Sequence, residues 1–489
     1  SAPWGIPLGS IPNYNYPIGS SIAFNDTFPW FAVLMKFVSP FLPAKAQVVG
    51  LWMLLNFVLQ GVFGFLLVRS LGGRVLPTFA AACFFVTSPV FLFRFDAGHA
   101  SLCAHWCVLA ALWLAAKFPK GDAPVTGWVF LLFLAWSSHP YLGAMVLPIA
   151  LVYSGRKLST VAMRCTAMML ASILPLYLFG YLTNSRSNQD AGFHYFATDI
   201  LAFFNPHDRS VFFRGPTRAG QYEGFAWLGA GMCALLLLEL LDLFRRGESL
   251  INLVRKSRHR SLVLICLLMA LFALGSNVRV WGNWIFQLEW FYEPLSFLTG
   301  PFRSGGRFVW PLYYLLFAGI LIRMQKRWGS TAMVLMFAAF VCQVIDQYPV
   351  IASAQRLEKS EDFIELSAPG WDQLGGAFNH VALVPPHFEE GICGGDAVEY
   401  PTTYYAPFAL FASQQGMTIN SGPRARPPRA SEAKYCEDFM TRLRHGVLER
   451  DTVYVVANSF RDRFKLWTRD SASCEALDGK MVCIRKQEF

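Results

Sequence analysis

The stretch Phe93–Trp106, with the sequence FRFDAGHASLCAHW, decides the fold because it places polar residues between two long apolar runs. One run covers residues 75–93 and the next covers residues 98–116. A connection this short cannot form a domain, so its ionisable side chains lie at a membrane–water boundary or in a polar cavity inside the protein. We predict that this boundary carries the functional site. The candidate substrate-binding residues of the stretch are Arg94, Asp96, His99 and His105.

The composition of the 489 residues is that of a membrane protein. Hydrophobic residues make up 54% of the chain and charged residues only 15%, against about 25% in soluble proteins. Several apolar runs approach the roughly 20 residues that a bilayer span needs. The sequence therefore predicts a polytopic α-helical membrane protein. Its net charge of +10 is best interpreted loop by loop, and it does not indicate a nucleic-acid partner.

We predict ten spans in this chain. They cover residues 46–68, 75–93, 98–116, 125–137, 139–153, 160–182, 225–244, 261–275, 308–324 and 329–347. The fourth and fifth belong to one apolar region broken by SSHPY at Ser137–Tyr141, so they form either one long helix or two short ones. Two short helices place every basic loop on the same side, which is the positive-inside pattern. On that choice His139 lies at an outer turn and becomes a further substrate-binding candidate.

Three regions follow from this pattern. Residues 1–45 form an extracytoplasmic loop with an interfacial helix over 28–41, residues 46–347 form the transmembrane domain, and residues 348–489 form a small extracytoplasmic α/β domain. An even number of cysteines in the last region suits an oxidising compartment. The predicted pairs are Cys474 with Cys483, which flank a hairpin turn, and Cys393 with Cys436.

Asp26, in SIAFNDTFPW, is the only carboxylate in the first 95 residues. An acid in an aromatic loop at the membrane surface is a candidate general base or substrate ligand. The alternative is a structural role, in which Asp26 caps the helix over 28–41.

Arg303 and Arg307, in PFRSGGRFVWP, lie at the start of the ninth predicted span. Two guanidinium groups separated by a glycine pair can converge on a phosphate, and Arg94 can join them. The alternative is ordinary anchoring to lipid headgroups.

The outer histidines and Glu223 are candidates for sugar or phosphate contacts. His99 and His105 are six residues apart and do not share a helical face, so no metal site and no divalent-metal cofactor is predicted. Glu223 lies in QYEGFAWLGAG among aromatic residues, a combination found in sugar-binding clefts. The alternatives are polar residues satisfied inside the bundle and an interfacial aromatic belt.

Seven segments carry a family resemblance. They are IAFNDTFPWFAVLMK, GLWMLLNFVLQG, DAGHASLCAHW, HPYL, YEGFAWLGAG, FRSGGRFVWP and INSGPRAR, spread over residues 22–426. With them the chain resembles a bacterial family of uncharacterised polytopic membrane proteins that is similar to the GT-C class of glycosyltransferases. The resemblance implies the inner membrane and a polyprenyl-phosphate sugar donor. It also implies a further span before Ser1. The catalytic acid of such enzymes often follows that span, in which case Asp26 is a substrate ligand.

The function expected from this resemblance is inverting glycosyl transfer on the extracytoplasmic side. The acceptor is a glycan, a lipid or a protein, Asp26 is the base, and the arginines stabilise the leaving phosphate. One alternative is a transporter or flippase for a lipid-linked or anionic solute, with the same arginines as binding groups. Another is a non-catalytic scaffold with a sensing outer domain.

Cysteine labelling from outside intact cells tests the predicted topology. Ser257→Cys should stay unlabelled and Ser360→Cys should react, because residues 246–259 are predicted to be cytoplasmic and residues 348–489 extracytoplasmic. The parent chain, labelled in the same way, is the control that measures the reaction of the native cysteines. The reverse labelling pattern would contradict every assignment of a residue to the outer side.

Overall fold

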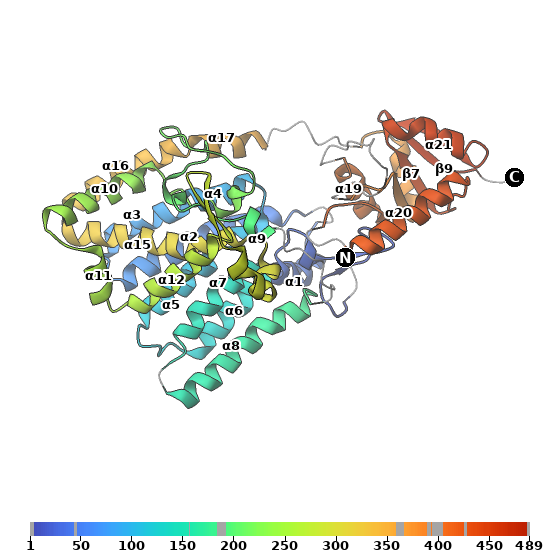
Figure 1. Cartoon of the computed structure of the whole chain (residues 1–489). Helices are drawn as coiled ribbons and strands as arrows, with labels where there is room; N and C mark the ends of the chain where they lie inside the picture. The colour runs from blue at the N-terminus through green and yellow to red at the C-terminus, as the bar shows by residue number, and fades with distance from the viewer. Residues whose placement is uncertain are drawn as a thin grey trace.

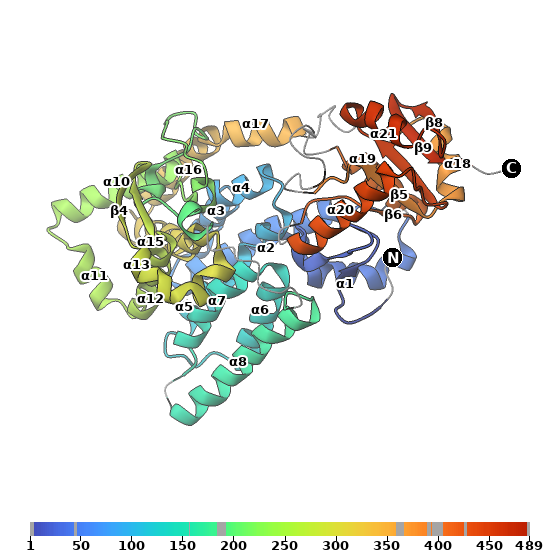
Figure 2. The same cartoon turned by 45° about the vertical axis from the view of Figure 1, so that its right-hand side comes forward.

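The computed structural model describes residues 4–43, 46–155, 157–182, 192–357, 366–388, 393, 404–424 and 428–486, without the side chains of 298 and 354–357. Arg156 of the basic loops and the labelling position Ser360 lie outside the described residues. The chain forms a large helical body and a smaller C-terminal unit built on a sheet, with the N-terminal segment between them in both views (Figures 1 and 2).

The helical body is built from helices that follow the apolar runs of the sequence. Its main helices are α2 (Val49–Ser70), α3 (Val75–Val86), α4 (Pro89–Asp96), α5 (Trp106–Lys117), α6 (Val125–Ser138), α7 (Pro140–Val152), α8 (Leu158–Leu178), α10 (Ala230–Arg245), α11 (Leu250–Lys256), α12 (Arg260–Ala273), α15 (Trp310–Arg327) and α16 (Thr331–Asp346). Helix α17 (Tyr348–Leu357) leads away from the body. Short 3-10 helices lie at the span ends: η3 (Ala100–Cys103), η5 (Gln221–Gly224) and η8 (Gly305–Val309).

The prediction of ten spans is wrong. Five helical stretches among the described residues are long and apolar enough to cross a membrane. They are Val49–Ser70, Val75–Asp96, Ala100–Lys117, Leu158–Leu178 and Gly305–Arg327. At the other predicted positions, α6, α7, α10, α12 and α16 have only 13 to 16 residues, short of the roughly 20 that a span needs. Apolar composition identified these helices, but their length was set by the turns at each end.

The basic loops contact one another at one end of the helical body. Arg258 donates to the carbonyl of Ser70 at 3.2 Å, and Lys326 donates to the carbonyl of Leu71 at 3.2 Å. The backbone N–H of Arg74 donates to Gln325 at 3.1 Å. Three loops that are far apart in the sequence therefore share one end, and the Phe93–Trp106 stretch is left near the other.

Helix α5 is the most enclosed helix of the body, and it fixes the end of the Phe93–Trp106 stretch. Its residues are almost all buried between α2, α7 and α15. Trp106 donates its indole N–H to Asn56 at 2.9 Å, and Trp52 donates to the carbonyl of Ala100 at 2.7 Å. The buried indole N–H groups of Trp52 and Trp106 thus both have a partner, and the turn before α5 is tied to α2.

The C-terminal unit is a three-layer α/β structure. The strand order is β6-β5-β7-β9-β8, with parallel pairs around β5 and antiparallel pairs around β9. The strands are β5 (His380–Val384), β6 (Thr418–Ile419), β7 (Thr452–Val456), β8 (Ala472–Leu477) and β9 (Lys480–Arg485). Helices α18 (Gly370–Ala377) and α19 (Ala406–Gln415) cover one face, and α20 (Arg429–Arg444) and α21 (Arg461–Trp467) cover the other. Both faces are apolar, as a covered sheet requires.

The N-terminal segment joins the two parts. The backbone of Ile419 in β6 exchanges hydrogen bonds with Tyr16 and Asn13 at 2.8 and 2.9 Å, which adds the segment to the sheet edge. On the other side, Leu8 donates to the carbonyl of Leu178 at 2.8 Å and Ser21 donates to Phe179. Helix α1 (Pro29–Val38) follows, where an interfacial helix was predicted. Residues 8–21 therefore touch both the helical body and the C-terminal unit.

The C-terminal unit contains both predicted disulfides. Cys474 and Cys483 are directly paired across β8 and β9, with their Cα atoms 4.1 Å apart. The turn between these strands contains Asp478 and Gly479, both with positive φ, as a tight hairpin requires. Cys393 and Cys436 close a longer loop of 43 residues. Two disulfides in this unit suit an oxidising environment.

Removing each disulfide should lower stability, and the loss should be larger for the longer loop. Chain entropy predicts a loss of about 3 kcal/mol for Cys474→Ala with Cys483→Ala, and about 4 kcal/mol for Cys393→Ala with Cys436→Ala. Denaturant unfolding of the parent chain and of each double variant measures the two losses separately. The parent chain with reductant gives the loss of both disulfides together. Free thiols at all four positions in non-reduced mass spectrometry would contradict the pairing.

Candidate functional site

One buried carboxylate holds two buried arginines where the loops meet the span ends. Glu223 in η5 accepts a hydrogen bond from Arg307 Nε at 2.8 Å and from Arg307 Nη2 at 2.5 Å. Arg94, at the end of α4, reaches the same carboxylate at 2.9 Å and the Glu223 backbone carbonyl at 3.2 Å. We call Arg94, Glu223 and Arg307 the ion triad. It brings together three candidates that the sequence predicted separately.

The charges of the triad are compensated inside the protein. Arg94 is fully buried, and Glu223 and Arg307 are almost fully buried. Burial alone would raise the pKa of Glu223, but the guanidinium groups of Arg307 and Arg94 hold it well below its usual value. Glu223 is therefore ionised at physiological pH. Its one negative charge faces two positive charges, so the triad carries a net positive charge next to the turn of His99.

Aromatic faces complete the enclosure of the two guanidinium groups. Arg94 lies 5.1 Å from the ring centres of Phe93 and Trp310, and Arg307 lies 4.5 Å from that of Tyr141. Guanidinium groups bind to aromatic faces more favourably where water is excluded. Tyr141 also accepts a hydrogen bond from the backbone N–H of Ser304 at 2.7 Å. The turn that separates α6 from α7 is thereby joined to the Arg303–Arg307 segment.

Two of the histidines are fixed in the same tautomer by their partners. Arg94 can only donate, so His99 Nδ1, 3.1 Å away, accepts. His139 Nδ1 accepts from the backbone N–H of Tyr141 at 3.1 Å. Burial, with a further contribution from Arg94, lowers the pKa of His99 below its usual value. Each imidazole, when neutral, therefore carries its proton on Nε2, where it can donate to a hydroxyl or a phosphate.

His105 and Asp96 lie apart from this arrangement. His105 is fully buried inside the bundle, 2.6 Å from the Tyr314 hydroxyl, and its ring centre lies 4.1 Å from that of Trp310. Asp96 lies in electrostatic range of Arg209, whose guanidinium covers the ring of Phe93 at 4.3 Å. Of the four candidates in the Phe93–Trp106 stretch, Arg94 and His99 belong to the triad region.

Asp26 caps a helix, but not the helix that was predicted. Helix α1 has no side-chain cap. Both oxygens of Asp26 instead face the first turn of η3: the backbone N–H of Ala100 donates to Oδ2 at 2.7 Å and that of Ser101 donates to Oδ1 at 3.0 Å. The Ser101 hydroxyl also donates to Oδ1. A carboxylate has about four lone-pair positions, so one on Oδ2 stays available. Asp26 is thereby fixed to the Phe93–Trp106 stretch.

Arg303 differs from the other two arginines. Its side chain is exposed, lies 5.6 Å from the ring centre of Phe196, and has no carboxylate partner among the residues that the structure describes. Tyr222 lies within electrostatic range of both Arg303 and the ion triad. The predicted pair therefore separates: Arg307 is held by Glu223, whereas the exposed guanidinium of Arg303 forms no ion pair with a described residue.

Sequence reasoning missed three residues of this region. Tyr141 links two turns, Ser101 completes the ligation of Asp26, and Asp346 fixes the start of α10 by accepting from Ala230 and Trp227 at 3.0 and 3.1 Å. Asp346 is fully buried at the end of α16, where its place in an apolar run was the available signal. The described part of the chain contains no His, Cys, Asp or Glu group suited to a metal ion.

The comparisons place the chain in a family without giving a reaction. A family described as Domain of unknown function (DUF6311) matches residues 1–348, and its C-terminal domain matches residues 370–485. The chain belongs to this family. No curated protein is similar enough to be matched. The first match ends at the first residue of α17 and the second begins at the first residue of α18, and all three members of the ion triad lie in the first.

Glu223→Gln should destabilise this DUF6311 protein strongly, because it leaves two guanidinium groups buried with no compensating charge. The expected loss is about 3–5 kcal/mol, the range for breaking a buried ion pair. Since the pKa of Glu223 is depressed on folding, its contribution is complete above its unfolded value of about 4.3 and is lost only as the pH falls below it.

Thermal and denaturant unfolding in detergent at pH 7 measures this effect. The control is Glu248→Gln, which removes the partner of Arg327 in an exposed pair and should cost less than about 1 kcal/mol. Equal losses in the two variants would show that the triad is not a structural centre.

Proposed function

We propose that this protein is an inverting membrane glycosyltransferase that uses a polyprenyl-phosphate sugar donor on the extracytoplasmic side. The observation that carries the proposal is that a carboxylate and two Nε2–H imidazoles lie around the ion triad: His99 is within electrostatic range of Asp26 and of the triad, and His139 is within range of His99 and the triad. The exposed guanidinium of Arg303 lies on the segment that Tyr141 joins to this region. The four groups come from four separate segments. Such a set supplies a proton acceptor, hydroxyl donors and a phosphate ligand, the groups that glycosyl transfer from a phosphate needs.

In the proposed reaction, an acceptor hydroxyl attacks the anomeric carbon from the face opposite the phosphate. The new bond joins the acceptor oxygen to that carbon, and the bond from the carbon to the phosphate oxygen breaks. The bonding electrons leave on the polyprenyl phosphate, and the hydroxyl proton passes to Asp26. The free lone pair on Asp26 Oδ2 is the position for this proton.

The arginines take different roles from those that their sequence positions suggested. Both arginines of the ion triad already bind Glu223, so they position the turn of His99 and add a local positive charge. Arg303 is the group that binds the leaving phosphate directly. Its planar fork suits bidentate phosphate contact. His99 and His139 donate to sugar hydroxyls.

Five helices that can span a membrane, with shorter apolar helices packed among them, suit a lipid-linked donor. A polyprenyl chain stays in the bilayer, and its phosphate lies at the headgroup level, which is where exposed arginines bind phosphate. The acceptor is a hydroxyl of a glycan, a lipid or a protein. The disulfide-bonded C-terminal unit, joined to the site through residues 8–21, is the part that the acceptor meets.

Asp26→Asn should lower transfer at least 100-fold while leaving donor binding within a few-fold, because the amide cannot accept the proton. The assay uses the purified chain in proteoliposomes with polyprenyl-phosphate glucose, galactose or mannose, and it measures release of the polyprenyl phosphate. Asp122→Asn, at an exposed position in the loop after α5, is the matched control and should match the parent.

The cap on η3 makes a second variant necessary. Ser101→Ala removes one hydrogen bond to Asp26 but keeps the carboxylate, so it should lower thermal stability slightly and retain most of the transfer rate. If Asp26→Asn and Ser101→Ala lose stability and transfer to the same degree, Asp26 is a structural cap and the proposed base is wrong.

A further inference from the structure

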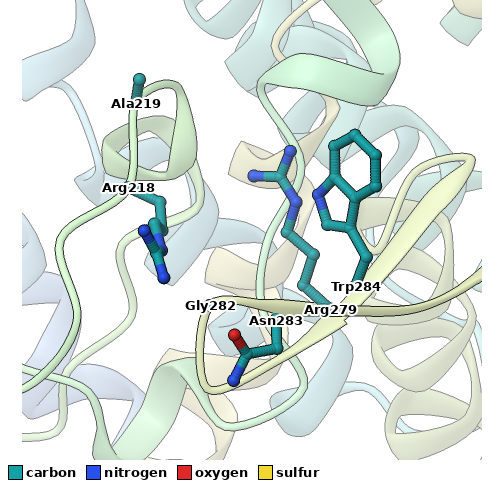
Figure 3. Close-up of a pocket in the computed structure, with 6 residues that line it drawn as sticks. All are labelled: Arg218, Ala219, Arg279, Gly282, Asn283 and Trp284. Carbon is teal, nitrogen blue, oxygen red and sulfur yellow. The ribbon is translucent and has the colours of Figure 1, made fainter.

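A second basic opening lies away from the ion triad, between the loop before η5 and a β-hairpin. Its cavity of about 370 Å³ is lined by the residues in Figure 3: Arg218, Ala219, Arg279, Gly282, Asn283 and Trp284. The hairpin consists of β3 (Asn277–Val280) and β4 (Asn283–Gln287). Figure 3 shows the side chains of Arg218 and Arg279 on opposite sides of this opening, with the indole of Trp284 beside Arg279.

Arg279 is buried, and its guanidinium forms no ion pair with a carboxylate in the described ranges of the chain. The residue is 6% exposed, and its Nε has no hydrogen-bond partner within the described part of the chain. The guanidinium packs 5.6 Å from the ring centre of Trp284. An enclosed charged donor that lacks a partner is costly, so such a group indicates a ligand. Burial lowers the pKa of Arg279, which nearby Asp199 partly opposes.

Asp199 is close to Arg279 but is used elsewhere. Its carboxylate accepts from the backbone N–H groups of Leu201, Trp281 and Gly282 at 2.7, 3.1 and 2.7 Å. Trp281 and Gly282 form the hairpin turn, and both have positive φ. A tryptophan in this conformation is unusual, and the bonds from Asp199 hold it there. The acid therefore shapes the opening and leaves the guanidinium of Arg279 unpaired.

Arg218 approaches the opening from the other side and packs closely against the hairpin turn. A Cβ at Gly282 would lie 3.2 Å from Arg218 Cγ and 3.3 Å from its Nε, so the absence of a side chain allows this contact. Two guanidinium groups then face one small space. Like charges repel, so an anion between them removes an unfavourable interaction and adds planar, bidentate contacts.

The surface around the opening is apolar and exposed, which indicates the source of the anion. Every residue of β4 is exposed, although three of the five are large and apolar. The exposed apolar residues of the hairpin and the neighbouring loops include Phe212, Trp281, Trp284, Ile285, Phe286 and Trp290. A two-stranded hairpin that is apolar on both faces needs a cover, and tryptophans gather at membrane interfaces.

We infer that Arg218 and Arg279 bind the phosphate group of a membrane lipid, while the apolar side chains of the hairpin lie in the interface beside its acyl chains. The hairpin is followed by Glu289 and Glu293, so its surface as a whole is not basic. The selectivity for a phosphate lipid must therefore come from the two arginines. This inference concerns binding alone and does not rest on the proposed transfer reaction.

Binding of short-chain lipids to the purified full chain in an uncharged maltoside detergent tests this site. The probes are dioctanoyl phosphatidic acid, dioctanoylglycerol and inorganic phosphate, each measured by calorimetry. Phosphatidic acid should bind at least tenfold more tightly than either of the others, because it alone presents both the phosphate and the acyl chains.

Arg279→Gln and Arg218→Gln should each weaken the binding of phosphatidic acid about tenfold, the size of a lost charged hydrogen bond. Arg218 is exposed, so its variant stays informative if Arg279→Gln fails to fold. The control is Arg214→Gln, which removes an exposed charge from the same loop outside the opening and should bind as the parent does.

Two results would overturn the inference. Parental binding of phosphatidic acid by both Arg218→Gln and Arg279→Gln would show that the arginines are not the phosphate ligands. Inorganic phosphate binding as tightly as the lipid would show that the site takes a soluble anion. If a variant loses sugar transfer but still binds phosphatidic acid as the parent does, the result concerns the proposed transfer reaction and leaves the lipid site supported.

Discussion

The ion triad is the interaction on which the rest of this end of the molecule depends. Two guanidinium groups cannot remain buried without a compensating charge, and Glu223 supplies it from a loop more than 80 residues from either the α4 end or η8. The loop must therefore close onto the bundle for the charges to be paired. Because Arg94 also binds His99, this closure sets the position of the Phe93–Trp106 stretch as well.

The arginines of the protein's two candidate sites fall into two groups: those that pair with Glu223 and hold the structure, and those that remain available to a ligand. Arg307 and Arg94 are committed to Glu223, whereas Arg303 is exposed and Arg279 is enclosed with no ion pair among the residues that the structure describes. The two available guanidinium groups lie in different surroundings. Arg303 lies within electrostatic range of Tyr222 near the triad, and Arg279 lies in strand β3 of the apolar hairpin. A protein at a lipid surface can in this way bind a reacting phosphate and a lipid phosphate with separate groups.

The N-terminal segment connects the candidate site to the C-terminal unit. Residues 8–21 extend the sheet edge at β6 and also bind the end of α8, and Asp26 follows directly and caps η3. A cavity of about 460 Å³ lies between this segment and the start of α20, with Arg424 in its wall. Arg424 donates to the carbonyl of Gly19 and pairs with buried Glu432. The C-terminal unit and Asp26 are therefore connected through this short segment.

The sequence by itself determined the features that depend on local composition: the apolar helices, the strands and paired cysteines of the C-terminal unit, and the polar residues at the span ends. It also indicated that α6 and α7 separate at His139, because basic residues collect on one side. It could not determine the number of spans, since helix length is set by turns and packing. Only the tertiary structure decided which charges meet. Glu223 pairs with Arg94 and Arg307, and Asp26 caps η3 rather than α1, because such partners lie more than 70 residues apart and no local pattern specifies them.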